Sequence, residues 1–291
     1  MNAAVLKRWA ISALIAAGCL WGMSFLFGKL AFHELSVSQV VLYRFALASL
    51  VLLPVAFWRC IWPRPRDLPL FMLTGFLTVT MTFLVQFLGL KLTSASNAAL
   101  IIGLLPPLLA LAAVILTHER LSKGGWLAIG CSSLGAILIV GQPGRDNNWL
   151  GDGLVFVSLF AVVGWTLLGK RLSQAYTAIV ATAYSFLFGI LTLLPISLWW
   201  DGVPRLDLSP QAWLSVLILG VLCSASTTVL WNWGLTRFPV ARAGVYLNLE
   251  PLVGLVLGIS VLREPFGPMA VVGGGLILGA AVYLSRQGVG V

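Results

Sequence analysis

Two charged side chains stand inside apolar stretches of this sequence, and they are its first candidates for chemistry. Arg44 lies in the stretch 36–57 and Glu250 lies in the stretch 240–262. Placing either charge at the centre of a bilayer costs on the order of 3 kcal/mol on insertion scales, so each needs a compensating partner. Arg44 could bind a carboxylate or phosphate of a ligand, and Glu250 could bind an amine or carry a proton. The alternative is a structural role, in which each charge pairs with the other or with backbone carbonyls.

Prolines interrupt two of the apolar stretches. Pro106 and Pro107 lie in the stretch 94–116, and Pro251 follows Glu250 directly. A proline cannot donate to the helix ladder, so carbonyls one turn earlier lose their usual partners and these stretches are expected to bend. Irregular backbone at membrane depth is tolerated where it is buried in protein or lines a wet cavity. The paired breaks therefore indicate a binding site, with ordinary proline kinks as the alternative.

Aromatic and polar side chains recur at similar depths and are the predicted lining of such a site. Tyr246 and Glu250 are four residues apart and are expected to share a helix face. A pocket of rings with a few directional polar groups suits small organic solutes better than bare ions. Besides Arg44 and Glu250, the expected substrate-binding residues are Trp21, Ser24, Tyr43, Gln86, Asn97, Trp165, Tyr184, Trp231, Asn232, Tyr246 and Asn248.

Two acidic residues and two glycine pairs are expected to act in the architecture. Glu119 and Glu264 end apolar stretches at matching places, which predicts structural or gating roles. The GxxxG spacings at 254–258 and 275–279 predict close helix approach.

Features of a catalytic, metal or cofactor site are not found in the sequence. Its four cysteines lack metal-ligand spacing, and His33 and His118 stand alone. The phosphate-binding pattern GxxxxGK[ST] is absent, which argues against ATP-driven transport. We therefore predict no catalytic residue, no metal and no cofactor.

Composition places the chain in a bilayer. It is 59% hydrophobic and 9% charged, whereas soluble domains carry about 25% charged residues. Apolar stretches of about 20 residues, long enough to cross the hydrocarbon core, can be drawn ten times. The predicted spans are 10–31, 36–57, 68–90, 94–116, 122–141, 149–170, 175–199, 210–235, 240–262 and 266–285.

The basic residues that give the net charge of +9 are distributed over the loops and do not form one basic patch. Of the 18 basic residues, twelve fall on one side of the predicted spans, five fall on the other, and Arg44 lies within a span. The positive-inside rule accounts for this bias and predicts that both termini are cytoplasmic. A nucleic-acid partner is not expected.

The sequence contains an internal repeat. A shift of 141 places six residues on identical ones, namely Gly28, Lys29, Tyr43, Phe45, Pro54 and Trp58. A shift of 145 does the same further along for Gly75, Thr82, Gly89, Ala98, Pro106, Glu119 and Gly130. Because each copy holds five predicted spans, the copies must be inverted in the bilayer, which is typical of transporters. We predict an all-α membrane protein with ten transmembrane helices, built as two inverted five-helix repeats, 1–145 and 146–291, around a central cavity.

Several short motifs occur in a characteristic order along the chain. They are Trp21-Gly22, Tyr43-Arg44-Phe45, Gly89-Leu90, residues 93–99, Pro106-Pro107, Glu119, Asn248-Leu249-Glu250-Pro251 and Glu264. By this order, spacing and duplication the chain resembles the EamA-type branch of the drug/metabolite transporter superfamily. The resemblance implies a ten-helix exporter of small metabolites, amino acids or drugs in a bacterial inner membrane. The second copy departs from the first at Ser185, which stands where Arg44 would be matched.

The expected function is export of small organic metabolites by alternating access around a midplane cavity. The expected partners are a small-molecule solute, the lipid bilayer and a coupling proton, and a monomer is expected. Two alternatives remain: a lipid-carrier flippase of the same fold, or a membrane-embedded enzyme. The absence of a catalytic constellation argues against the enzyme.

Overall fold

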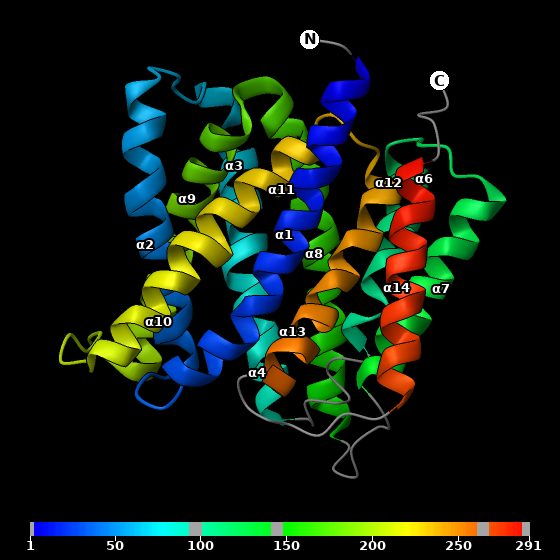
Figure 1. Ribbon diagram of the computed structural model, residues 1–291. Helices are drawn as coiled ribbons and strands as arrows, with labels where there is room; N and C mark the ends of the chain where they lie inside the picture. The colour runs from blue at the N-terminus through cyan, green and yellow to red at the C-terminus, as the bar shows by residue number, and fades with distance from the viewer. Residues whose placement is uncertain (1–2, 93–100, 141–147, 261–267, 287–291) are drawn as a thin grey trace.

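Helices joined by short connections make up the described chain in the computed structural model, and no strand occurs in residues 3–92, 101–140, 148–260 and 268–286, which the structure describes (Figure 1). The helices of the first half are α1 (Ala3–Ala31), α2 (Val37–Trp58), η1 (Pro65–Asp67), α3 (Leu68–Gly75), η2 (Phe76–Leu84), α4 (Val85–Leu92), α6 (Leu105–Leu116) and α7 (Lys123–Val140). Those of the second half are α8 (Trp149–Tyr176), α9 (Ala178–Asp201), α10 (Pro210–Gly220), η3 (Val221–Ser226), α11 (Thr227–Leu235), α12 (Val240–Ala243), η4 (Gly244–Asn248), α13 (Leu249–Ser260) and α14 (Pro268–Arg286).

Six helical segments of the described chain are long and apolar enough to cross a membrane. They are Val5–Gly28, Val37–Trp58, Pro65–Gly89, Trp149–Tyr176, Ala178–Asp201 and Pro210–Leu235. Two shorter apolar helices, Leu105–Leu116 and Val271–Arg286, lie beside them. Large apolar side chains such as Leu50 and Leu127 face outward, with 69% and 70% of their surfaces exposed. Lipid tails are the natural solvent for such a surface.

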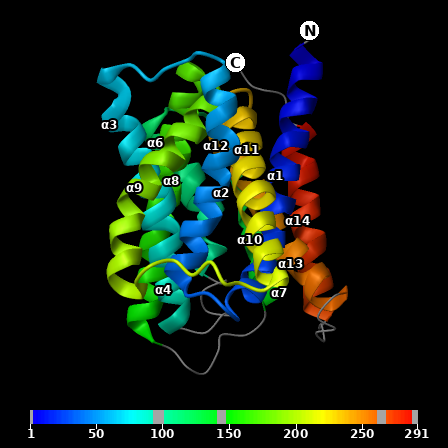
Figure 2. The same cartoon turned by 90° about the vertical axis from the view of Figure 1, so that its left-hand side faces the viewer.

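The helices run roughly side by side, and the two termini lie at the same end of the bundle (Figure 1). We call this the terminal end. The connections 59–64, 117–122 and 236–239 also lie there. At the flanks, α2 packs against α9 and α7 packs against α14 (Figures 1 and 2).

Polar caps fix where several helices begin. Ser36 forms a capping box with Gln39 at the start of α2, in which each side chain bonds the backbone amide of the other residue. Asn148 accepts from two backbone amides at the start of α8, and Ser209 accepts from one at the start of α10. Such caps satisfy amides that have no partner inside the helix.

Two helices change to π geometry at matching places. The π segments η2 and η3 begin at Phe76 and Val221, which are 145 residues apart. At both places a threonine hydroxyl donates to the carbonyl five residues earlier: Thr82 of η2 to Leu77 at 2.8 Å, and Thr227, which directly follows η3, to Leu222 at 2.7 Å. Such π-bulges are rare and are found frequently at functional sites.

Glycine contacts between helices also occur in matched pairs. A Cβ on Gly89 of α4 would lie 2.8 Å from the side chain of Val155 in α8. A Cβ on Gly234 of α11 would lie 2.8 Å from the side chain of Leu14 in α1. The glycines are 145 residues apart and their neighbours are 141 apart, which are the two shifts of the sequence repeat.

The GxxxG prediction for 275–279 is wrong. Both glycines are exposed, and nothing lies within 4 Å of a Cβ built on either one. The surroundings of Gly258, in the second predicted pair, lie outside the described part of the structure. The close approaches occur instead at single glycines such as Gly75, whose Cβ would lie 2.1 Å from the carbonyl oxygen of Ser185.

Candidate functional site

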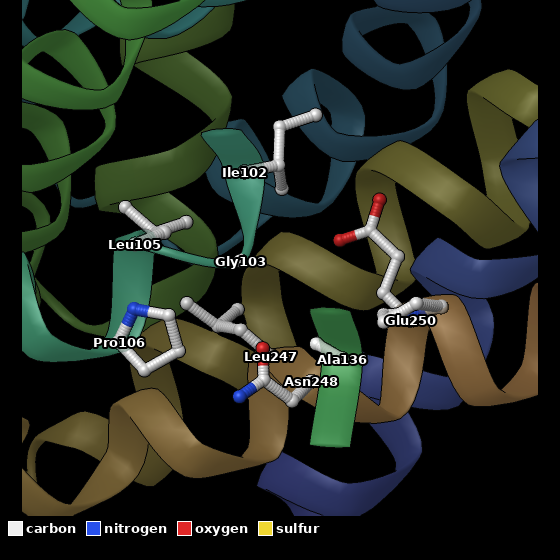
Figure 3. A pocket seen from close by; sticks show the side chains of 9 residues that line it. Ile102, Gly103, Leu105, Pro106, Ala136, Leu247, Asn248 and Glu250 are labelled. Atoms are coloured by element: carbon white, nitrogen blue, oxygen red, sulfur yellow. The ribbon is translucent and has the colours of Figure 1, made fainter. Parts of the chain in front are cut away.

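A small cavity lies where two interrupted segments meet (Figure 3). Its volume is about 30 Å³, enough for on the order of one water molecule. Four of its residues in the first half have partners 145 positions later that also line it: Ile102 with Leu247, Gly103 with Asn248, Leu105 with Glu250, and Pro106 with Pro251. Ala136 of α7 completes the lining.

The prolines at the cavity start new helices instead of bending continuous ones. Residues 103–104 form a turn, and α6 begins at Leu105 with Pro106 in its first turn. In the second half, the 3-10 segment η4 separates α12 from α13, whose first turn contains Pro251. A proline is well tolerated in the first turn, because no helical partner is available for its missing amide. The expected bends are therefore full interruptions.

Glu250 lies in the first turn of α13, and its side chain lines the cavity (Figure 3). The positive end of a helix dipole favours a carboxylate at this position. Among the described residues, none donates a hydrogen bond to this carboxylate. Asn248, by contrast, has a partner: its side-chain amide donates to the Ser132 hydroxyl of α7 at 2.8 Å.

Arg44 is buried and is held by the π segments. Its Nη2 donates to the Cys223 carbonyl of η3 at 2.8 Å, and its Nε donates to the Ser224 hydroxyl. The guanidinium carbon also lies 4.4 Å from the ring centroid of Phe83 in η2, a cation–π distance. Arg44 and Glu250, both within the described chain, are not joined by an ion pair within 4 Å. Of the alternatives for Arg44, these contacts match a structural role in which the guanidinium binds a backbone carbonyl.

Three tryptophans from separate helices meet in the core. The ring of Trp21 on α1 lies 5.5 Å from that of Trp231 on α11 and 6.2 Å from that of Trp165 on α8, centroid to centroid. The indole nitrogens of Trp165 and Trp231 are buried without a hydrogen-bond partner in the described structure. A buried donor without a partner costs roughly 1–3 kcal/mol. These indole N–H groups can therefore donate to a hydrogen-bond acceptor on a bound ligand.

Asn232 directly follows Trp231 of this cluster in the sequence, and one of its two side-chain polar atoms has a hydrogen-bond partner. Its side-chain nitrogen donates to Thr182 of α9 at 3.1 Å, whereas its oxygen has no partner among the described residues. Ser24 lies one turn along α1 from Trp21, with its side chain beside the Cys223 thiol. Both residues could accept or donate to a bound solute.

Of the expected substrate-binding residues that the structure describes, Asn248 and Glu250 line the cavity and the others do not. Arg44, Ser24, Asn232 and the three tryptophans are absent from its lining, as are Tyr43, Tyr184 and Gln86. Tyr43 donates to the backbone oxygen of Arg205, in the loop after α9. Tyr184 packs with Phe71, at 5.9 Å between ring centroids. Gln86 is half-buried in α4 and is not among the cavity residues.

Tyr246 is expected on one helix face with Glu250, but only Glu250 of the two lines the cavity. Tyr246 lies in the 3-10 segment η4, whose turn is three residues, and it is fully buried outside the cavity lining. Predicted residues Asn97 and Glu264 lie outside the described residues. The sequence reasoning missed the apolar lining at Leu105, Ala136 and Leu247, which carries no chemical signal beyond its nearness to the prolines.

Comparison with known proteins places this architecture in a family. The sequence pattern of the EamA-like transporter family matches residues 8–141 and, a second time, residues 149–286. One crystal structure of a protein aligns with a TM-score of 0.80 at 18% identity, covering 94% of this chain and 95% of that one. At this identity the likeness shows the fold alone.

Curated relatives are named as transporters. An uncharacterized transporter of Archaeoglobus fulgidus is 30% identical, covering 91% of this chain and 93% of its own length. A biotin transporter of Salmonella typhimurium is 25% identical, with 95% and 93% covered. A probable terminal-alkyne amino-acid exporter of Streptantibioticus cattleyicolor is 26% identical, with 97% and 95% covered.

Proposed function

Because the chain belongs to the EamA-like transporter family, we propose that it is a secondary transporter that exports small organic metabolites across an inner membrane by alternating access. The observation that carries this proposal is the meeting of two helix interruptions at one cavity, lined by residues 145 positions apart. Interrupted helices beside a central cavity are the usual binding architecture of secondary transporters.

The proposal includes ten spans arranged as two inverted five-helix halves, 1–145 and 146–291. Each of the ten predicted ranges contains a helix of the described chain, and six helical segments are long enough to span by themselves. Support for the repeat comes from contacts made twice with exchanged roles, as with Gly89 on Val155 and Gly234 on Leu14. The excess of basic residues favours a cytoplasmic terminal end.

For the solute, we favour amino acids or related compounds that carry a carboxylate, with drugs as a wider class. The relatives' named solutes, biotin and a terminal-alkyne amino acid, both carry one. In this chain the unpartnered indole donors of Trp165 and Trp231 suit a carboxylate oxygen. Glu250 suits an ammonium group or a coupling proton. The cavity of about 30 Å³ is too small for such a solute, so binding requires a more open state.

Solute exchange in proteoliposomes tests the function. Vesicles loaded with unlabelled biotin or propargylglycine, a terminal-alkyne amino acid, would be placed in a trace of the labelled compound. We expect accumulation of label by counterflow with at least one probe and none in protein-free vesicles. Movement of lipid-linked sugars instead, with no exchange of either soluble probe or of further amino acids, would contradict the proposal and favour the flippase.

A further inference from the structure

The carboxylate of Glu119 joins the two halves of the chain at the terminal end. Glu119 follows α6, and its Oε1 accepts from Lys170 Nζ of α8 at 2.8 Å. The same oxygen accepts from the backbone amide of Val240 at 3.1 Å, and Oε2 accepts from that of Ala241 at 2.8 Å. These amides open α12, so one side chain of the first half bonds two elements of the second.

The setting makes these bonds stronger than ordinary surface contacts. Only 14% of the Glu119 side chain and 19% of the Lys170 side chain are exposed. Salt screens partly buried charges much less than exposed ones. Hydrogen bonds to an ionised acceptor are also shorter and stronger than those between neutral groups. Glu119 therefore holds α12 in place by both charge and hydrogen bonds.

The helix that Glu119 holds, α12, is separated from α13 of the same predicted span by a change of helix type. Between α12 and α13 lies the 3-10 segment η4, and a stretch of 3-10 helix within a span often marks a hinge. On the inner side α12 packs against α6, and a Cβ on Gly244 would lie 3.2 Å from Cα of Pro106. Leu247 and Asn248 of η4 line the cavity.

We propose that Glu119 and Lys170 form a latch that closes the cavity toward the terminal end by holding α12 against α6 and α8. When the latch opens, α12 turns about η4 and the cavity becomes accessible from that end. The latch rests on the proposed transport by alternating access, and it assigns Glu119 and Lys170 as positioning residues for one closed state.

The sequence repeat indicates which residues match the latch in the other half of the chain. In the sequence, Lys29 matches Lys170 and Glu264 matches Glu119, but Glu264 and the side chain of Lys29 lie outside the described structure. A control within the described chain is Glu34, whose carboxylate accepts from the Ser209 amide at 2.9 Å and from its hydroxyl. This pair caps α10 at the end opposite the latch (Figure 1).

Accessibility of a cavity residue measures the latch directly. Ala136→Cys would be placed in a chain whose four native cysteines are replaced, and membrane-impermeant maleimide would be added to vesicles of each orientation. Because a charged acceptor binds amides and an ammonium group more strongly than a neutral one does, we expect Glu119→Gln to raise labelling from the terminal end about tenfold or more. Lys170→Met should raise it less, because Glu119 keeps its bonds to α12. Glu34→Gln should leave labelling from the terminal end unchanged.

The latch fails if Glu119→Gln and Lys170→Met both leave labelling from the terminal end unchanged, or raise it equally from both ends. If Glu119→Gln does not fold, Lys170→Met alone decides the test, since the hydrogen bonds from the α12 backbone to Glu119 remain in that variant. Counterflow of biotin and propargylglycine by the unmodified chain is measured alongside. One-sided labelling with no counterflow of either probe or of further amino acids would refute the proposed metabolite transport, whereas counterflow without one-sided labelling would refute the latch.

Discussion

Replacement of Arg44 distinguishes a structural tether from a solute ligand. In Arg44→Ala the guanidinium no longer donates to the Cys223 carbonyl or to the Ser224 hydroxyl. The hydroxyl keeps a partner, since it also donates to the Leu219 carbonyl at 2.8 Å. The Cys223 carbonyl loses the bond from Arg44. The variant should therefore be destabilised even with no solute present.

The expected size follows from these contacts. Two hydrogen bonds from a charged donor contribute roughly 1.5–3 kcal/mol each, and burying the charge costs on the order of 3 kcal/mol. The net gain from Arg44 is then about 0–3 kcal/mol. Truncation to Ala adds the cost of a buried acceptor without a donor, roughly 1–3 kcal/mol. We expect Arg44→Ala to lower the free energy of unfolding by about 1–6 kcal/mol, the sum of these two ranges.

Double-mutant cycles in detergent, with unfolding by added sodium dodecyl sulfate, identify the partner of Arg44. The coupling of Arg44→Ala with Ser224→Ala should be roughly 1–3 kcal/mol, because the two side chains are in direct contact. The coupling with Glu250→Gln should be smaller, since no ion pair joins these described residues. Arg44→Lys should recover little, because an ammonium cannot reproduce the fork of the guanidinium. A larger coupling with Glu250 than with Ser224, or an Arg44→Ala variant of full stability, would refute the tether.

Three further predictions concern Glu250, the glycine contacts and acid stability. If Glu250 carries the coupling proton, Glu250→Gln should retain counterflow but lose accumulation driven by a pH gradient, and retained accumulation would exclude that role. Gly234→Ala places a Cβ 2.8 Å from Leu14 and should cost roughly 1–3 kcal/mol in detergent unfolding, whereas the exposed Gly279→Ala should change stability by less than about 0.5 kcal/mol. Hydrogen bonds from the Ser209 hydroxyl and amide lower the pKa of Glu34. This stabilisation is therefore present above the ordinary carboxyl pKa of about 4.3 and is lost as pH falls through the lowered value, so melting curves of Glu34→Gln should lack that acid step.

Hydropathy predicted most of the helices because the bilayer imposes one length on every span. The predicted range 36–57 differs from α2 (Val37–Trp58) by one residue at each end. The range 68–90 covers three successive segments: α3, the π segment η2 and most of α4. A change from α to π geometry moves a hydroxyl's acceptor by only one residue, as from i−4 to i−5 at Thr82. Composition carries no record of such a change, so η2 and η3 could not be predicted.

The proline positions predicted where the spans are interrupted but not how. Pro251 could equally bend a continuous helix or begin a new one, and only the 3-10 geometry of η4 decides between them. Tyr246 of this segment is fully buried and does not line the cavity. For Tyr43, residue type suggested a pocket, but its hydroxyl reaches a loop far along the chain, at Arg205. Long-range loop contacts of this kind leave no periodic signal in a sequence.

The two walls of the cavity share a backbone plan but differ in chemistry. Gly103 and Leu105 of the first half are apolar, whereas their matches 145 residues later, Asn248 and Glu250, are an amide and an acid. Under the proposed alternating access, such a plan would give the two halves closed states of similar energy. A charge on one wall alone has no matching charge opposite to repel it, so one proton or one ammonium group can neutralise the site. For that reason the departure from symmetry at Glu250 is the feature that we expect to set which solutes move.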